Sequence, residues 1–236
     1  MREKLIYILI SSVILSSCNF TSADAYFNQA FEYEEKGDLP KAIELLDKAI
    51  EKQSDFRPAL LNRGYYKTEL GNLKDGISDY QKILKFDSDN TLALYNIGLN
   101  FQDLEEPQKA IEYFTRALNT DGALTSFPNE NGGTLGIRKK LDFSKIDNDN
   151  DFEVHDCEIQ FSRGINYLFI KEFDKAITDF ENSIEANYSK ADCYFLIAEA
   201  YIEKKDSINA CENYIKSAKL GDLDARNKLK LHCIKK

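Results

Sequence analysis

Apolar residues recur at helical spacing over most of the chain after residue 22, and similar helical sequences recur several times. Four stretches echo one another: KAIELLDKAI, KAIEYFTRAL, KAITDFENSI and NACENYIKSA. Aligning them places repeat starts at Ala23, Arg57, Thr91, Cys157 and Ala191, which lie 34 residues apart except for one gap after the third. A repeat of this length predicts a helix-turn-helix unit, and stacked units predict an all-α solenoid.

Small residues occupy the positions where the two helices of each repeat are expected to approach. On the first helix these are Ala30, Gly64, Gly98, Gly164 and Ala198, and on the second they are Ala42, Gly76, Ala110, Ala176 and Ala210. Aromatic residues or Leu follow four positions later and are expected to fill the remaining space. Turn signals such as Gly37-Asp38 and Gly71-Asn72 separate the helices. We therefore interpret these residues as core positions rather than catalytic ones.

The residues resemble the tetratricopeptide repeat (TPR) family. Its aromatic-x2-Leu-Gly-x2-Tyr and Ala-x3-Phe pattern corresponds to Leu94-x2-Ile97-Gly98-x2-Phe101 and Ala110-x3-Phe114 in repeat three. The chain departs from the pattern at Lys67, which stands at the Tyr position of repeat two, and in lacking the terminal Pro of every repeat. The resemblance implies repeats one to three over residues 23–124, repeats four and five over 157–224, and a cap helix over 225–236.

The first 17 residues have the pattern of a bacterial secretory signal. Arg2 and Lys4 precede an apolar stretch that is too short to span a membrane as a helix, and Leu15-Ser16-Ser17-Cys18 resembles the lipobox of bacterial lipoproteins. That resemblance implies a lipid anchor on Cys18 as the mature N-terminus, with residues 18–22 as a short tether. Because Asn19 is not the Asp that retains such proteins in the inner membrane, we expect the periplasmic face of the outer membrane.

Residues 125–156 do not fit the repeat and predict an irregular, partly ordered insert. The run Asp147, Asp149, Asp151 with Glu158 has the ligand spacing of an EF-hand loop. Phe152 occupies the sixth position, where that loop needs Gly for its turn. We therefore expect a solvated acidic loop rather than a calcium site, and no metal elsewhere.

An apolar groove on the concave side is the candidate binding site. In TPR proteins this side is formed by the first helices, whose fifth and ninth positions we take as its main contributors. Nine of these ten positions are apolar: Phe27, Phe31, Leu61, Tyr65, Tyr95, Leu99, Phe161, Ile165 and Phe195. Because exposed apolar area is costly in water, we expect a partner segment, the insert itself or tighter coiling to cover them. Phe27, Phe31 and Asn96 stand where a carboxylate clamp needs other residues, which excludes that site.

Catalytic chemistry is not indicated. His155, Asp156 and Cys157 are adjacent in sequence, but neighbours in sequence rarely face one another. The chain shows no phosphate loop, dinucleotide fingerprint or nucleophile elbow, so we expect neither an enzyme nor a cofactor. Its net charge of −9 argues against nucleic acid as a partner. Cys157, Cys193, Cys211 and Cys233 are expected as free core thiols, with disulfides in the C-terminal half as the alternative.

Together these features predict a membrane-anchored adaptor of the bacterial cell envelope that holds a protein or peptide segment in its groove. An assembly factor for outer-membrane proteins or pili, or a regulator of peptidoglycan enzymes, is the alternative. The sequence leaves the oligomeric state open, because a fold of interaction repeats does not by itself specify a partner.

Overall fold

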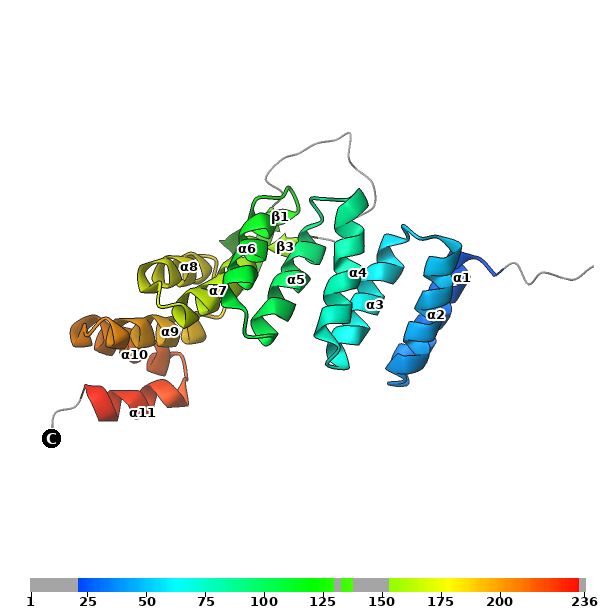
Figure 1. The fold of residues 1–236 in the computed structure, drawn as a ribbon. Coiled ribbons are helices and arrows are strands. Elements are labelled where there is room, and N and C mark those ends of the chain that lie inside the picture. The colour runs from blue at the N-terminus through cyan, green and yellow to red at the C-terminus, as the bar shows by residue number, and fades with distance from the viewer. Residues whose placement is uncertain (1–20, 130–132, 138–152, 234–236) are drawn as a thin grey trace, which may run out of the picture.

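A computed structural model of the protein describes residues 21–129, 133–137 and 153–233. Within these residues eleven helices follow one another in a curved array, with α1 and α11 at opposite ends (Figure 1). The helices are α1 (Ala23–Glu34), α2 (Leu39–Lys52), α3 (Arg57–Glu69), α4 (Leu73–Phe86), α5 (Thr91–Asp103), α6 (Pro107–Leu118), α7 (Asp156–Phe169), α8 (Phe173–Glu185), α9 (Lys190–Glu203), α10 (Ser207–Lys219) and α11 (Leu223–His232). The predicted helical solenoid is confirmed, and the first helix of each repeat begins within one residue of its expected start.

Local signals explain where the helices begin. The side chains of Ser22, Asp38, Asn90, Asp206 and Asp222 accept hydrogen bonds from backbone N–H groups in the first turns that follow them. Such N-caps satisfy backbone donors that have no partner inside a helix. The helices α2, α3 and α6 also carry Pro in their first turn, where the missing N–H costs nothing.

Close contacts at the small residues hold each pair of helices together. A Cβ atom added at Gly64 would lie 2.7 Å from the ring of Tyr80, and one added at Gly98 would lie 2.6 Å from the ring of Phe114. In repeat four the corresponding distance from Gly164 to the Phe180 ring is 2.8 Å. These rings are fully buried, so the predicted packing of an aromatic ring against a helix backbone is confirmed.

The insert contains a small β-sheet that the sequence did not predict. Its strands are β1 (Ala123–Pro128), β2 (Thr134–Ile137) and β3 (Val154–His155), in the order β2-β1-β3, with β1 antiparallel to β2 and parallel to β3. Asn129 closes the hairpin because its backbone N–H donates to the carbonyl of Gly133 and its side chain accepts from the Gly133 N–H. The insert is therefore partly ordered, as expected, but these residues form regular strands rather than the irregular segment that the sequence predicted.

The sheet lies at the ends of the helices rather than within the array (Figure 1). The Val154 N–H donates to the carbonyl of Gly122, which places the start of β3 beside the end of repeat three. The Thr134 hydroxyl donates to the carbonyl of Ala186 just after α8. The insert therefore joins repeats three and four, with Ala123 and Val154 buried in the same core as Phe114.

One disulfide joins Cys211 in α10 to Cys233 directly after α11, while Cys157 and Cys193 are free and buried. The expectation of free core thiols is thus correct for two residues and wrong for the other two. Spacing alone did not decide this, because α11 must first fold back along α10 before the two sulfurs meet. The helix α11 buries only Ala225 fully, so the cross-link supplements a small apolar contact.

Removing this disulfide should loosen the cap helix. Its two cysteines are 22 residues apart, and closing a loop of that size in the unfolded chain contributes about 3 kcal/mol. We expect a dithiol reductant, or Cys233→Ser, to increase amide hydrogen exchange in α11 far more than in α3. The reductant should leave the Cys233→Ser variant unchanged. Equal exchange in oxidised and reduced wild-type protein would contradict this prediction.

Candidate protein-binding surface

The first helices of the repeats form one continuous surface, which we call the inner face: α1, α3, α5, α7 and α9. Successive members of the series α3, α5, α7 and α9 contact each other directly. Hydrogen bonds join them at equivalent places: the Asn100 amide donates to Thr68 Oγ1 at 2.9 Å, and the Asn166 amide donates to Gln102 Oε1 at 2.7 Å. These side-chain bridges join α3 to α5 and α5 to α7 in the middle of the inner face.

The predicted groove residues differ in exposure, and the two exposed ones are at ninth positions while the two buried ones are at fifth positions. At the ninth positions Phe31 is 36% exposed and Tyr65 is 47% exposed, while Leu99 and Ile165 are half-buried. At the fifth positions Phe27, Phe161 and Phe195 are half-buried, but Leu61 and Tyr95 are only 7% and 8% exposed.

Leu61 and Tyr95 are therefore core residues, which corrects their assignment to the groove surface. Leu61 packs in the cluster that contains Tyr80, and the Tyr95 ring lies 5.7 Å from that of Phe114. The Tyr95 hydroxyl also donates to Glu158 Oε1 at 3.1 Å. The fifth position points toward the second helix of its own repeat, so its side chain is used for packing.

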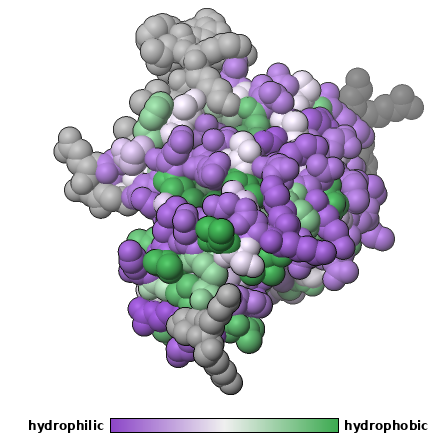
Figure 2. Space-filling view, turned by 90° about the vertical axis from the view of Figure 1, so that its left-hand side faces the viewer, coloured by the Kyte–Doolittle hydropathy of each residue, from purple (hydrophilic) through white to green (hydrophobic). Residues whose placement is uncertain are grey.

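The cap helix reaches the C-terminal end of the inner face. Lys228 Nζ lies 2.8 Å from Glu199 Oε1 and 5.9 Å from the centroid of the Phe195 ring. The Tyr214 hydroxyl donates to the same Glu199 carboxylate. Glu199 is the one polar residue among the ten groove positions, and its charge is matched by a cation that sequence reasoning did not place there. Figure 2 views this end of the molecule, where apolar patches are interspersed with hydrophilic surface.

Two buried ion pairs lie at matching places in repeats two and four, and sequence reasoning missed both. Arg63 Nε donates to Asp79 Oδ2 at 2.8 Å, and Arg163 Nε donates to Asp179 Oδ2 at 2.8 Å. In each pair the second guanidinium nitrogen binds the other carboxylate oxygen. Both pairs could have been predicted from the sequence, because in each the Arg is at the seventh position of its repeat and the Asp follows 16 residues later on the second helix.

The surroundings of the two aspartates differ, and so do their pKa values. Burial disfavours the charge of Asp79, but hydrogen bonds from Arg63, Lys67 and Lys82 outweigh it and lower the pKa of Asp79 below its ordinary value. Burial dominates at Asp179, which has a single cationic partner, and raises the pKa of Asp179. Each pair joins the first helix of its repeat to the second helix.

The three adjacent residues His155, Asp156 and Cys157 have different surroundings, and the Ser126 hydroxyl lies 3.4 Å from His155 Nδ1. The backbone N–H of Ser126 donates to Asp156 Oδ1 at 3.0 Å, so this carboxylate holds β1 beside α7. Burial raises the pKa of the Cys157 thiol and disfavours the thiolate that a nucleophile needs. The described residues contain no group of three or more His, Cys, Asp or Glu arranged to hold a metal ion.

Other sequence predictions concern residues outside the described part of the chain. These are the signal segment 1–17, the lipidated Cys18 and the acidic run Asp147, Asp149 and Asp151. Glu158, the last residue of the EF-hand-like spacing, is described, and it accepts the hydrogen bond from Tyr95. Among the described helices none has the length and apolar character to cross a bilayer.

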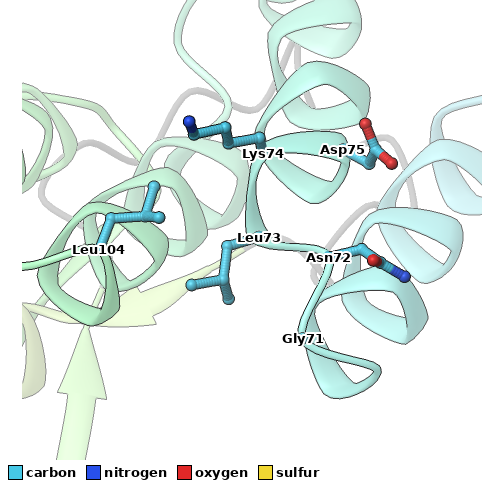
Figure 3. Close-up of a pocket in the computed structure, with 6 residues that line it drawn as sticks. All are labelled: Gly71, Asn72, Leu73, Lys74, Asp75 and Leu104. Atoms are coloured by element: carbon cyan, nitrogen blue, oxygen red, sulfur yellow. The ribbon is translucent and has the colours of Figure 1, made fainter.

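A small surface depression lies at the turn between α3 and α4 (Figure 3). It is lined by Gly71, Asn72, Leu73, Lys74, Asp75 and Leu104. The Lys74 and Asp75 side chains extend in different directions from the first turn of α4. The polar groups of this depression therefore do not converge on one point, as those of a small-molecule site do.

Comparison with known families agrees with the repeat pattern. Family models described as tetratricopeptide repeat match residues 27–93, 92–123 and 191–220, which together include more than half of the 236 residues. The chain belongs to the tetratricopeptide repeat family. The matched residues do not include α7 and α8, yet these helices pack as the other pairs do, with Gly164 against Phe180. Repeat four of this TPR protein is therefore identified from the packing of its helices and not from a family model.

Curated relatives share the repeats but are longer proteins. DnaJ homolog subfamily C member 7 of Homo sapiens is 24% identical over 219 residues, which include 80% of this chain and 43% of the relative. Protein CTR9 homolog of Arabidopsis thaliana is 29% identical over 105 residues, which include 43% of this chain and 10% of the relative. The TPR chain thus spans less than half the length of either relative.

Solved structures share the fold over most of their length. MamA superposes with a TM-score of 0.65 at 20% identity, covering 92% of this chain and 98% of MamA. YrrB, described as a TPR protein with an unusual peptide-binding site, gives a TM-score of 0.67 at 21% identity and covers 90% and 93%. PilF of Pseudomonas aeruginosa gives 0.62 at 15% identity and covers 89% and 82%. At these identities the likeness establishes a TPR solenoid.

Proposed function

We propose that this TPR protein is a non-enzymatic adaptor that binds a protein segment on its inner face. The observation that carries the proposal is the exposure of Phe31 and Tyr65 on helices that are otherwise well packed. Exposed apolar area costs roughly 25 cal/mol per Å², so a row of such side chains on a rigid surface favours association with an apolar partner. The peptide-binding site attributed to YrrB supports a role of the same kind for this fold.

We further propose that the adaptor acts in the bacterial cell envelope, anchored by a lipid on Cys18 to the periplasmic face of the outer membrane. The support is the signal-like segment before Cys18 and its lipobox resemblance. The first repeat helix begins at Ala23, so only four residues separate it from Cys18. A chain extends at most about 3.5 Å per residue, and the first repeat would therefore lie close to the membrane.

Crosslinking in intact cells, followed by purification of the full protein and mass spectrometry, tests the proposal. We expect one envelope protein to be enriched with wild-type protein and lost with the double variant Phe31→Glu, Tyr65→Glu. The matched control is Ile208→Glu, because Ile208 is an exposed apolar residue on the second helix of repeat five, away from the inner face. The proposal fails if capture is unchanged in the double variant or is lost equally in the control.

The identity of a captured protein also decides between the finer alternatives. Precursors of outer-membrane proteins or pilus subunits would indicate an assembly factor, while a wall synthase or hydrolase would indicate a regulator of peptidoglycan enzymes. The fold likeness to PilF does not favour either, because it concerns architecture only.

A further inference from the structure

Repeats one to three present three parallel rows of side chains on the inner face. Each row repeats every 34 residues, at the sixth, ninth and thirteenth positions: Asn28, Asn62 and Asn96; Phe31, Tyr65 and Leu99; Glu35, Glu69 and Asp103. These positions are three and four residues apart, so they lie along one side of each helix. Every side chain in the rows is exposed or half-buried, and the three carboxylates are exposed. Each helix therefore offers an amide, an apolar group and a negative charge in the same order.

The inner face presents few positive charges that are free to bind a partner. The helices of the inner face carry few cations, and those of α3 and α7 bind carboxylates at or beside the second helices: Arg57 with Asp87, Arg63 and Lys67 with Asp79, and Arg163 with Asp179. Glu35, Glu69 and Asp103, by contrast, take part in no ion pair within the described part of the chain. The apolar row is therefore bordered by uncompensated negative charge.

The rows end at repeat four. The sixth, ninth and thirteenth positions there are Ser162, Ile165 and Phe169, and in repeat five they are Leu196, Glu199 and Glu203. The charge of Glu199 is matched by Lys228 of the cap helix. The three-row pattern is thus confined to α1, α3 and α5, before the insert.

We propose that these rows bind an extended partner segment in which a basic and an apolar side chain recur at every third residue, an inference that rests on the proposed adaptor function. Neighbouring packed helices lie about 8–10 Å apart, and a segment in the polyproline II conformation advances about 3.1 Å per residue with three residues per turn, so that every third side chain lies on the same side. Lys or Arg at every third residue of the segment then meets one carboxylate per repeat. The asparagine amides lie beside the apolar row and supply hydrogen bonds to the segment's backbone.

The ion pairs and the apolar contacts contribute differently to binding. Exposed ion pairs contribute little to affinity, so most of it comes from burying Phe31, Tyr65 and the partner's apolar side chains. The carboxylates favour a basic partner over an acidic one and raise the association rate at low salt. The proposed surface is therefore selective for charge although its core is apolar.

Fluorescence anisotropy with labelled peptides and the full-length protein in detergent tests the inference. The probe is the nonapeptide KLSKFSKLS, and the control replaces each Lys with Glu. We expect the basic peptide to bind at least tenfold more tightly, with the difference shrinking as salt is raised. The triple variant Glu35→Gln, Glu69→Gln, Asp103→Asn should remove most of this difference.

A matched variant separates local from overall charge. Glu51→Gln, Asp75→Asn, Glu112→Gln makes the same change in charge at exposed positions of second helices and should leave the selectivity intact. Equal binding of the two peptides, or equal loss in both triple variants, would overturn the inference. If the double variant of Phe31 and Tyr65 still abolishes capture in cells, the adaptor function stands and only the charge selectivity fails. If the two peptides bind equally and the double variant also leaves capture unchanged, both the charge selectivity and the adaptor function are rejected.

Discussion

Asp79→Asn should be among the most destabilising substitutions in the chain, lowering the free energy of unfolding by about 3–5 kcal/mol. The Asp79 side chain is fully buried and binds Arg63, Lys67 and Lys82. A neutral amide would leave the buried Arg63 guanidinium with Asp47, whose side chain is 49% exposed, as its remaining carboxylate partner. Lys67 and Lys82 would also lose the buried carboxylate that they bind, and this loss of the buried anion among three cations accounts for most of the expected effect. Urea unfolding followed by helical circular dichroism measures the effect.

Asp179→Asn is the matched control, because it removes the corresponding group from repeat four. Asp179 binds Arg163 alone, and burial raises the pKa of Asp179, so its charge contributes less favourably to the folded state. We therefore expect a smaller loss than at Asp79. Equal losses for the two variants would show that the additional lysines around Asp79 do not matter.

The effect of Asp79→Asn should also depend on pH. Because the folded-state pKa of Asp79 is lowered, the folded protein binds fewer protons there than the unfolded chain. Its contribution is fully present above the ordinary aspartate pKa of about 3.9 and is lost as the pH falls through the lowered value. The difference in stability between wild type and variant should therefore be constant near neutral pH and shrink below about pH 4.

Gly98→Ala should destabilise the protein by about 1–3 kcal/mol, the usual cost of overpacking a tight core. The added Cβ would lie 2.6 Å from the Phe114 ring, which is fully buried and has little space to move. Ala is the better helix former, so intrinsic propensity alone would predict a gain of up to about 1 kcal/mol. Thermal unfolding of the variant decides which effect is larger.

The double variant Gly98→Ala, Phe114→Leu tests the assigned cause. Repeat one has this combination naturally, with Ala30 and Leu46 both buried at the equivalent positions. If the contact with the ring is responsible, the double variant should lose less stability than the sum of the two single variants. Strictly additive losses would place the cause elsewhere.

The turn inside each repeat shows one limit of reading structure from local sequence. Gly37 and Gly71 have positive φ values of 74° and 79°, as Gly at a helix end predicts. At the equivalent position of repeats three to five, Glu105, Lys171 and Lys205 adopt φ values of 57° to 63°. For a non-glycine residue a positive φ value has a steric cost. The packing of the two helices therefore determines this conformation, whatever residue is present.

The binding surface was predictable only in part. Helical periodicity identified which positions face the inner side, and the exposure of Phe31 and Tyr65 agrees with it. It did not distinguish fifth from ninth positions, because both point to the same side of an isolated helix. The Tyr95 ring is buried because the Phe114 ring and the next first helix occupy the space around it.

The sequence by itself determined the repeat length, the starts of the first helices and the small residues at which helices meet, because these depend on contacts within one repeat. Only the tertiary structure decided features that join separate segments: the Cys211–Cys233 disulfide, the sheet between residues 123 and 155, and the Lys228–Glu199 ion pair. Each requires two distant segments to approach in a particular orientation. That orientation arises from the cumulative packing of neighbouring repeats, which no local pattern records.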